Sequence, residues 1–194
     1  MTNVSPEAGV MGESGMYAPR FSPGWVRVDG PLFVEGDAAS SALSFLAEQG
    51  DPTGLASSGG SSIPEEFEDS YEGSPLTSGV TFRTRFEALP GQQLHFASMF
   101  IESNDTIVGG EVALFDGDVP LSGDITSDFA YFDVGSEVNE EPGFGEGQPG
   151  GTMGGEDEAG VVTRFEVMDA AGFRYAPLDS VIRFELVVCE SPEC

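Results

Sequence analysis

VTFRTRFEALPGQQLHFASMFI, residues 80–101, carries two consecutive strand patterns joined by a turn. Over residues 80–88 apolar and polar side chains alternate, which is typical of a strand with one buried face. Residues 94–101 are apolar on both faces, as expected of a strand inside a sandwich. Glycine and proline in the connecting LPGQQ favour a tight turn. The segment therefore predicts neighbouring strands of an antiparallel sheet.

The rest of the chain extends this pattern into one domain, residues 1–194. Residues 38–49 predict a short helix, with Asp37 as its cap and Gly50 in the left-handed position after its last turn. Roughly seven strands and one helix predict a mainly all-β fold, an antiparallel β-sandwich with long loops. Residues 1–20 are irregular, and a glycine-rich loop follows Asp133 as far as about residue 160. The remaining predicted strands are residues 25–28, 111–115, 129–132, 161–168 and 180–188.

The charge balance excludes several classes of partner. The chain has 34 acidic residues against seven arginines and no lysine, for a formal net charge of −27. Such a field repels nucleic acid and anionic lipid and attracts divalent cations. Acidity also keeps a folded protein soluble, so most of these carboxylates are interpreted as solvated surface.

The two cysteines, Cys189 and Cys194, lie in a short C-terminal tail, residues 189–194. A small terminal disulfide is expected, which fits an oxidising compartment, while a reduced pair and intermolecular pairing stay open. No segment approaches the length needed to cross a bilayer. The start of the chain has no basic segment followed by an apolar run, so the chain is expected to be mature or to lack its leader.

Motifs for catalysis are missing from the sequence. The glycine runs lack the lysine of a phosphate-binding loop, and the single histidine, His95, is expected to be an ordinary strand residue. A hydrolase that uses paired carboxylates is the least favoured hypothesis, because pairs arise by chance among so many acids. The chain is therefore expected not to be an enzyme.

One acidic segment differs from the others. DVGSEVNEEP, residues 133–142, joins a strand end to a loop and spaces Asp133 and Glu137 around Gly135. Calcium prefers six to eight oxygen ligands from flexible loops of this kind, and glycine lets the backbone turn around the ion. The segment does not fit an EF-hand. An ordinary solvated loop remains the alternative on spacing alone.

Several segments follow one another in the order found in spondin domains, so the chain resembles a microbial relative of the F-spondin signature domain. They span most of the sequence. The segments are FSPG (21–24), VEGDAASSALSFLAEQGDPTGLA (34–56), LPGQQLHFASMFIESND (89–105), ALFDGDVPLSGDIT (113–126), DVGSEVNEEPGFG (133–145) and APLDSVIRFEL (176–186).

The resemblance implies a C2-like sandwich with calcium among the loops at one end. It implies Asp105, Asp133 and Glu137 as calcium ligands. The chain departs from the family pattern at Thr106, where an aromatic residue is common, and at Glu137, where the family has Asp. The alternating strand expected before Thr2 is also missing, which would leave a sheet edge for another chain to fill.

These observations lead to two functional hypotheses. The first is a secreted, extracellular or cell-surface adhesion or matrix module, stabilised by calcium, with a polysaccharide or another extracellular protein as partner. The alternative is a structural subunit that self-assembles into a filament or surface layer by N-terminal strand addition, giving a homo-oligomer.

Overall fold

A six-stranded antiparallel sheet forms the centre of the computed structural model, which describes residues 1–64, 75–149, 151 and 154–189. The strands lie in the order β12-β11-β7-β6-β4-β5. The expected all-β antiparallel class with few helices is confirmed. The strands are β4 Phe21–Val28, β5 Ser61–Ile63, β6 Gln93–Phe100, β7 Thr106–Ala113, β11 Phe129–Asp133 and β12 Thr163–Phe165.

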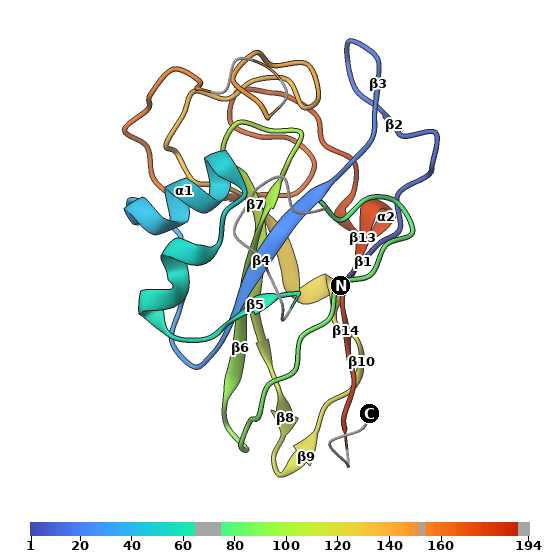
Figure 1. The fold of residues 1–194 in the computed structure, drawn as a ribbon, viewed down its shortest axis with the longest axis vertical. Coiled ribbons are helices and arrows are strands. Elements are labelled where there is room, and N and C mark those ends of the chain that lie inside the picture. The colour runs from blue at the N-terminus through green and yellow to red at the C-terminus, as the bar shows by residue number, and fades with distance from the viewer. Residues whose placement is uncertain (65–74, 150, 152–153, 190–194) are drawn as a thin grey trace.

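A second layer of short strands packs against one face of this sheet (Figure 1). Rings from both layers meet there: Phe184 contacts Phe96 and Phe129, with centroids 5.0 and 4.3 Å away. The layer contains the pairs β1–β13 and β10–β14, while the hairpins β2–β3 and β8–β9 extend from opposite ends of the molecule. Their bounds are β1 Thr2–Asn3, β2 Val10–Met11, β3 Met16–Tyr17, β8 Phe115–Asp116, β9 Val119–Pro120, β10 Gly123–Asp124, β13 Ile182–Arg183 and β14 Glu185–Leu186.

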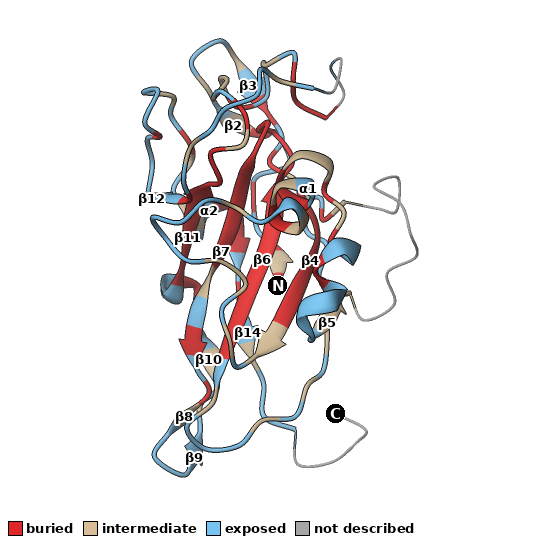
Figure 2. Ribbon diagram, turned by 90° about the vertical axis from the view of Figure 1, so that its left-hand side faces the viewer, coloured by how far each residue is buried: buried red, intermediate tan, exposed pale blue. Residues whose placement is uncertain are grey.

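The opposite face of the sheet is covered by helix α1 (Ser41–Gln49) and the 3-10 helix η1 (Thr53–Ser58). Leu43 and Leu46 of α1 belong to the same buried cluster as Trp25 of β4 and Ala97 of β6. Because both faces of the sheet are covered, its central strands are buried along most of their length (Figure 2). This explains why residues 94–101 are apolar on both faces.

Helix α1 begins later than the sequence predicts. Its cap is Ser40, whose Oγ accepts a hydrogen bond from the Leu43 backbone N–H at 3.2 Å. Asp37 belongs instead to the preceding turn, where its carbonyl accepts from the Val162 N–H. The C-terminal prediction is confirmed, because Gly50 has a φ of 69° and closes the helix.

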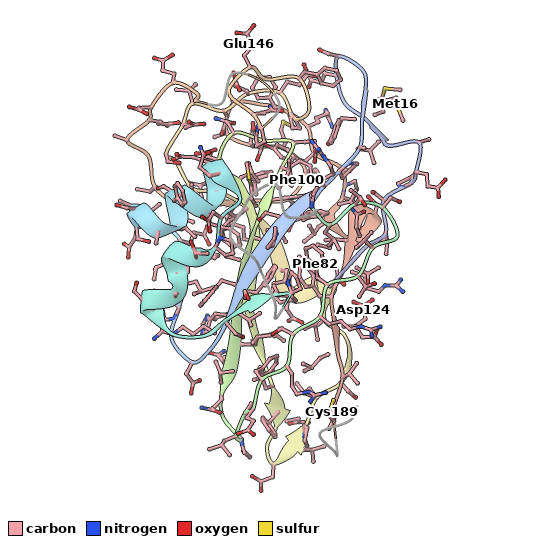
Figure 3. All side chains as sticks on the ribbon, in the orientation of Figure 1. Met16, Phe82, Phe100, Asp124, Glu146 and Cys189 are labelled. Carbon is pink, nitrogen blue, oxygen red and sulfur yellow. The ribbon has the colours of Figure 1, made fainter. Side chains whose placement is uncertain are left out.

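Residues 80–88 form no regular strand, so the prediction of a strand in this segment was wrong. The alternation does predict burial: Phe82 points into the core (Figure 3), and Phe86 and Ala88 are partly buried against it. Among the described residues, the backbone of this segment pairs at its start, where Thr81 bridges Thr2. A short partner strand cannot supply a longer ladder.

The N-terminal segment pairs with strands of its own chain. Strand β1 pairs with β13, and the Met1 amino group donates to the Phe82 carbonyl at 2.9 Å. Strand addition between chains stays a prediction, and it would require β1 to leave this position.

The predicted final strand, 180–188, is divided. Helix α2 (Leu178–Val181) comes first, and the two short strands β13 and β14 follow it. The expected Cys189–Cys194 disulfide stays untested, because Cys194 lies outside the described residues. Within the described part of the chain, no helix has both the length and the apolar character to cross a membrane.

Candidate metal centre

Asp105 and Asp133 lie at the same end of the main sheet, where β7 begins and β11 ends. Asp133 is the last residue of β11, and its cross-strand partner on β7 is Thr106, the residue after Asp105. The two aspartates therefore meet because β7 and β11 are antiparallel neighbours in this register. The long loop that follows Asp133 lies over this end of the sheet.

The side chain of Asp105 is fully buried and holds the start of that loop. Its Oδ2 accepts hydrogen bonds from the backbone N–H groups of Ser136, at 2.9 Å, and Glu137, at 3.0 Å. Its Oδ1 is buried as well and has no hydrogen-bond partner among the described residues. An orphaned carboxylate oxygen in the interior is costly unless a donor or a cation meets it.

Asp133 is buried beside it and shapes the same turn. Its Oδ1 accepts from the Gly135 N–H and its Oδ2 from the Asn139 side-chain amide, each at 2.8 Å. Gly135 has a φ of +67°, and a Cβ there would lie 2.7 Å from the Val161 nitrogen. Only glycine fits this position without strain.

Burial and charge act together on Asp105. Burial and, next, the neighbouring charge of Asp133 raise the pKa of Asp105 to about 7, against the hydrogen bonds from Glu137 and Ser136. Among the described residues no arginine forms an ion pair with Asp105 or Asp133. The site therefore has two buried carboxyl groups and no protein cation to balance them.

Glu137 donates its backbone N–H to Asp105, and the charge of its side chain also raises the pKa of Asp105. Its Oε1 accepts from the Gly155 N–H at 2.9 Å, and its Oε2 is buried without a partner among the described residues. Burial raises the pKa of Glu137, and the acids that add to this effect are Glu48, Glu140 and Asp157. The structure thus brings Asp105 and Asp133 together and turns the Glu137 carboxylate toward the loop around Gly155.

Acidic side chains alone do not complete a metal site here. Within the described residues, no three Asp, Glu, His or Cys side chains form a group that could hold a metal ion. Calcium also accepts amide and backbone carbonyl oxygens and water. The Asn139 side chain carries an amide oxygen of this kind: its Oδ1 is buried and has no partner among the described residues, while its amide nitrogen donates to Asp133.

Asn139 was not singled out from the sequence, although it lies within the predicted acidic segment. What distinguishes Asn139 is its buried oxygen without a partner, which no spacing rule reveals. Buried oxygens without a partner among the described residues thus occur on Asp105, Glu137 and Asn139, and the predicted calcium ligands Asp105, Asp133 and Glu137 stay a prediction.

No protein-family model matches this chain, and no curated protein matches its sequence. The resemblance to spondin domains therefore stays a prediction. The class that the fold defines is an all-β sandwich whose loops bury a pair of carboxylates at one end.

Proposed function

We propose that this chain is a non-enzymatic extracellular adhesion or matrix module, in which calcium held by Asp105 and Asp133 stabilises the loops at one end of the sandwich. The buried, uncompensated carboxylate pair carries the proposal. Two such charges taken out of water destabilise the fold unless a cation or protons neutralise them. Calcium supplies that charge and prefers oxygen donors.

A bound calcium ion would mainly stabilise the conformation of the loop after Asp133. Its stem is held by backbone hydrogen bonds, in which the Val138 N–H donates to Glu156, the Glu158 N–H to Ser136 and the Gly160 N–H to Gly135. The carboxylates of Asp105 and Asp133 anchor the inner side of this stem. Neutralising them would support the conformation of the described part of this loop, the surface that we propose for a partner.

The partner class follows from charge. A protein with a net charge of −27 is repelled by anionic lipid and nucleic acid at ordinary salt. A polysaccharide or another extracellular protein is therefore the partner we favour. A secreted or cell-surface location would also permit the proposed Cys189–Cys194 disulfide.

Calcium is expected to raise the thermal midpoint of the purified protein. At a calcium concentration 100 times the Kd, a ligand that binds only the folded state adds about 2.7 kcal/mol to its stability. For a chain of this length the midpoint should rise by about 5–10 °C. The measurement is thermal unfolding in EDTA and after addition of calcium chloride.

The Asp133→Asn variant should lose most of this shift, because it removes one of the two buried charges and preserves the side-chain shape. Asp118→Asn is the matched control: it removes the same charge from an exposed turn residue at the other end of the molecule. An equal shift with magnesium, or an unchanged shift in Asp133→Asn, would mean general screening of an acidic surface and would refute the site.

A further inference from the structure

Strand β12 is an outer strand of the six-stranded sheet and pairs on one side with β11 (Figure 2). On its other side, the turn of residues 36–37 covers the chain at Val162: the Gly36 N–H donates to the Val162 carbonyl, and the Val162 N–H donates to Asp37. Beyond Val162, no strand of the described chain pairs with this side. Residues 163–166 therefore form an open sheet edge.

The register of the sheet determines which backbone groups this edge offers. The Val134 N–H donates to the residue before β7. Because the hydrogen-bonding direction alternates along a strand, Tyr131 of β11 directs its backbone groups to β12, where its partner is Phe165. Arg164 and Glu166 therefore direct their N–H and carbonyl groups outward. The chain bends at residues 166–167, which confines any pairing to this short stretch.

The side chains of the open edge are complementary to those of an identical edge. Arg164 and Glu166 are both exposed and lie on one face of the strand, because they are two residues apart. Neither forms an ion pair among the described residues. When two copies align antiparallel with Phe165 opposite Phe165, each Arg164 lies opposite the Glu166 of the other copy. These are also the residues whose backbone groups face outward in both copies.

Apolar side chains flank these charges. Val161, Val167 and Met168 are 45%, 42% and 46% exposed. The face of the edge that carries Phe165 borders a hollow of about 310 Å³, which Leu178 also lines, so a second strand has room for its side chains there. An exposed edge with apolar residues is a site of association between chains.

We propose that two copies of this chain form a two-fold symmetric dimer by antiparallel pairing of their β12 edges, with Arg164 of each copy opposite Glu166 of the other. The same patch is used on both copies, so the interface closes and does not extend into a filament. The net charge of −27 on each chain opposes association. At about 0.15 M salt, however, charges more than about 8 Å apart are largely screened, whereas directly opposed pairs are closer together.

Sedimentation velocity of the purified protein in EDTA, at about 0.15 M salt, tests the dimer. Wild type should change from monomer to dimer as its concentration rises. Arg164→Glu places acids opposite acids and Glu166→Arg places arginines opposite arginines, so each should lower the association constant at least about tenfold. An equal mixture of the two variants should form a heterodimer about as tightly as wild type, because every acid then lies opposite an arginine. Asp118→Arg, an equal charge change in the exposed β8–β9 hairpin, should dimerise like wild type.

Three outcomes would overturn the proposal. A wild type that stays monomeric at every concentration, or that forms ever larger species, excludes a closed dimer. Undiminished association of either single variant assigns the contact to another surface. Failure of the mixture to restore association excludes this register. Circular dichroism verifies folding, and if a single variant unfolds, the double variant carrying both exchanges replaces the mixture and should dimerise like wild type. Because calcium is absent throughout, none of these results bears on the calcium site.

Discussion

Replacing Phe100 with alanine is expected to lower the free energy of unfolding by about 3–5 kcal/mol, the usual cost of truncating a buried phenylalanine. Phe100 ends β6 and is 1% exposed. Its ring lies 5.6 Å from each of three other rings and 6.3 Å from a fourth, those of Phe21, Tyr131, Tyr175 and Tyr17. These rings come from several strands and loops, so they cannot close together over the space that the mutation leaves.

The measurement is equilibrium unfolding in urea, and Phe45→Ala is the matched control. Phe45 lies on helix α1 with 47% of its surface exposed, so the same truncation there should cost about 0.5 kcal/mol. Equal costs at the two positions would contradict the packing described for Phe100.

Phe100 also supports the loop of the proposed calcium site. Its carbonyl accepts from the Ser103 hydroxyl at 2.6 Å, and the Ser103 Oγ accepts from the Thr106 N–H at 3.0 Å. These contacts shape the loop that presents Asp105. Calcium binding in Phe100→Ala should therefore weaken together with stability, whereas it should not in Phe45→Ala.

The sequence predicts the central strand of this fold well, because its run of apolar residues has a single cause, burial of both faces of the strand. Residues 94–101 are apolar on both faces, and β6 lies between two packed layers, with helix α1 on one side and the short strands on the other. Residues 80–88 show the limit of the same reasoning. Alternation indicates which side chains are buried, but a ladder also requires a partner strand of adequate length. Among the described residues the partner of this segment is the short N-terminal stretch around Thr2, which bridges Thr81.

The site was partly predictable for a related reason. Asp105 and Asp133 were identified through the resemblance and their position at strand ends, and the register of β7 against β11 places them side by side. Glu137 follows the same spacing, yet its carboxylate bonds to Gly155 from a distant part of the loop. Asn139 could not be selected from the sequence, because an unpartnered buried oxygen is a property of the packing.

Glu102 is expected to make this protein less stable as the pH rises from 5 to 8, the reverse of the usual behaviour of a paired carboxylate. Burial raises the pKa of Glu102 to about 7, even though Arg20 lowers it. The Glu102 Oε1 accepts from the Arg20 Nε at 2.5 Å and its Oε2 accepts from the Arg20 backbone N–H at 2.6 Å.

The direction of this pH dependence follows from where Glu102 binds its proton more tightly, in the folded or in the unfolded chain. The folded-state pKa of Glu102 lies above the ordinary value of 4.5, so between these two values the folded protein holds the proton more tightly than the unfolded chain. The stability from this group is present below pH 4.5 and is lost as the pH rises through 7. Between pH 5 and 8 the loss is about 2–3 kcal/mol. The charge of Glu102 also raises the pKa values of Tyr17 and Tyr131, but burial already holds these values far above the range of pH 5 to 8.

Urea unfolding of wild type and Glu102→Gln at pH 5 and pH 8, all in EDTA, measures this contribution. Asp105 titrates in both proteins, so the difference between their pH dependences isolates Glu102. Glutamine keeps an acceptor for Arg20 and cannot ionise, so the variant should lose about 2–3 kcal/mol less than wild type between the two pH values. The exposed Glu7→Gln is the control for the change in net charge and should follow wild type. The same pH dependence in all three proteins would show that Arg20 fully compensates the buried charge, and Glu102 would then be an ordinary ion-pair partner.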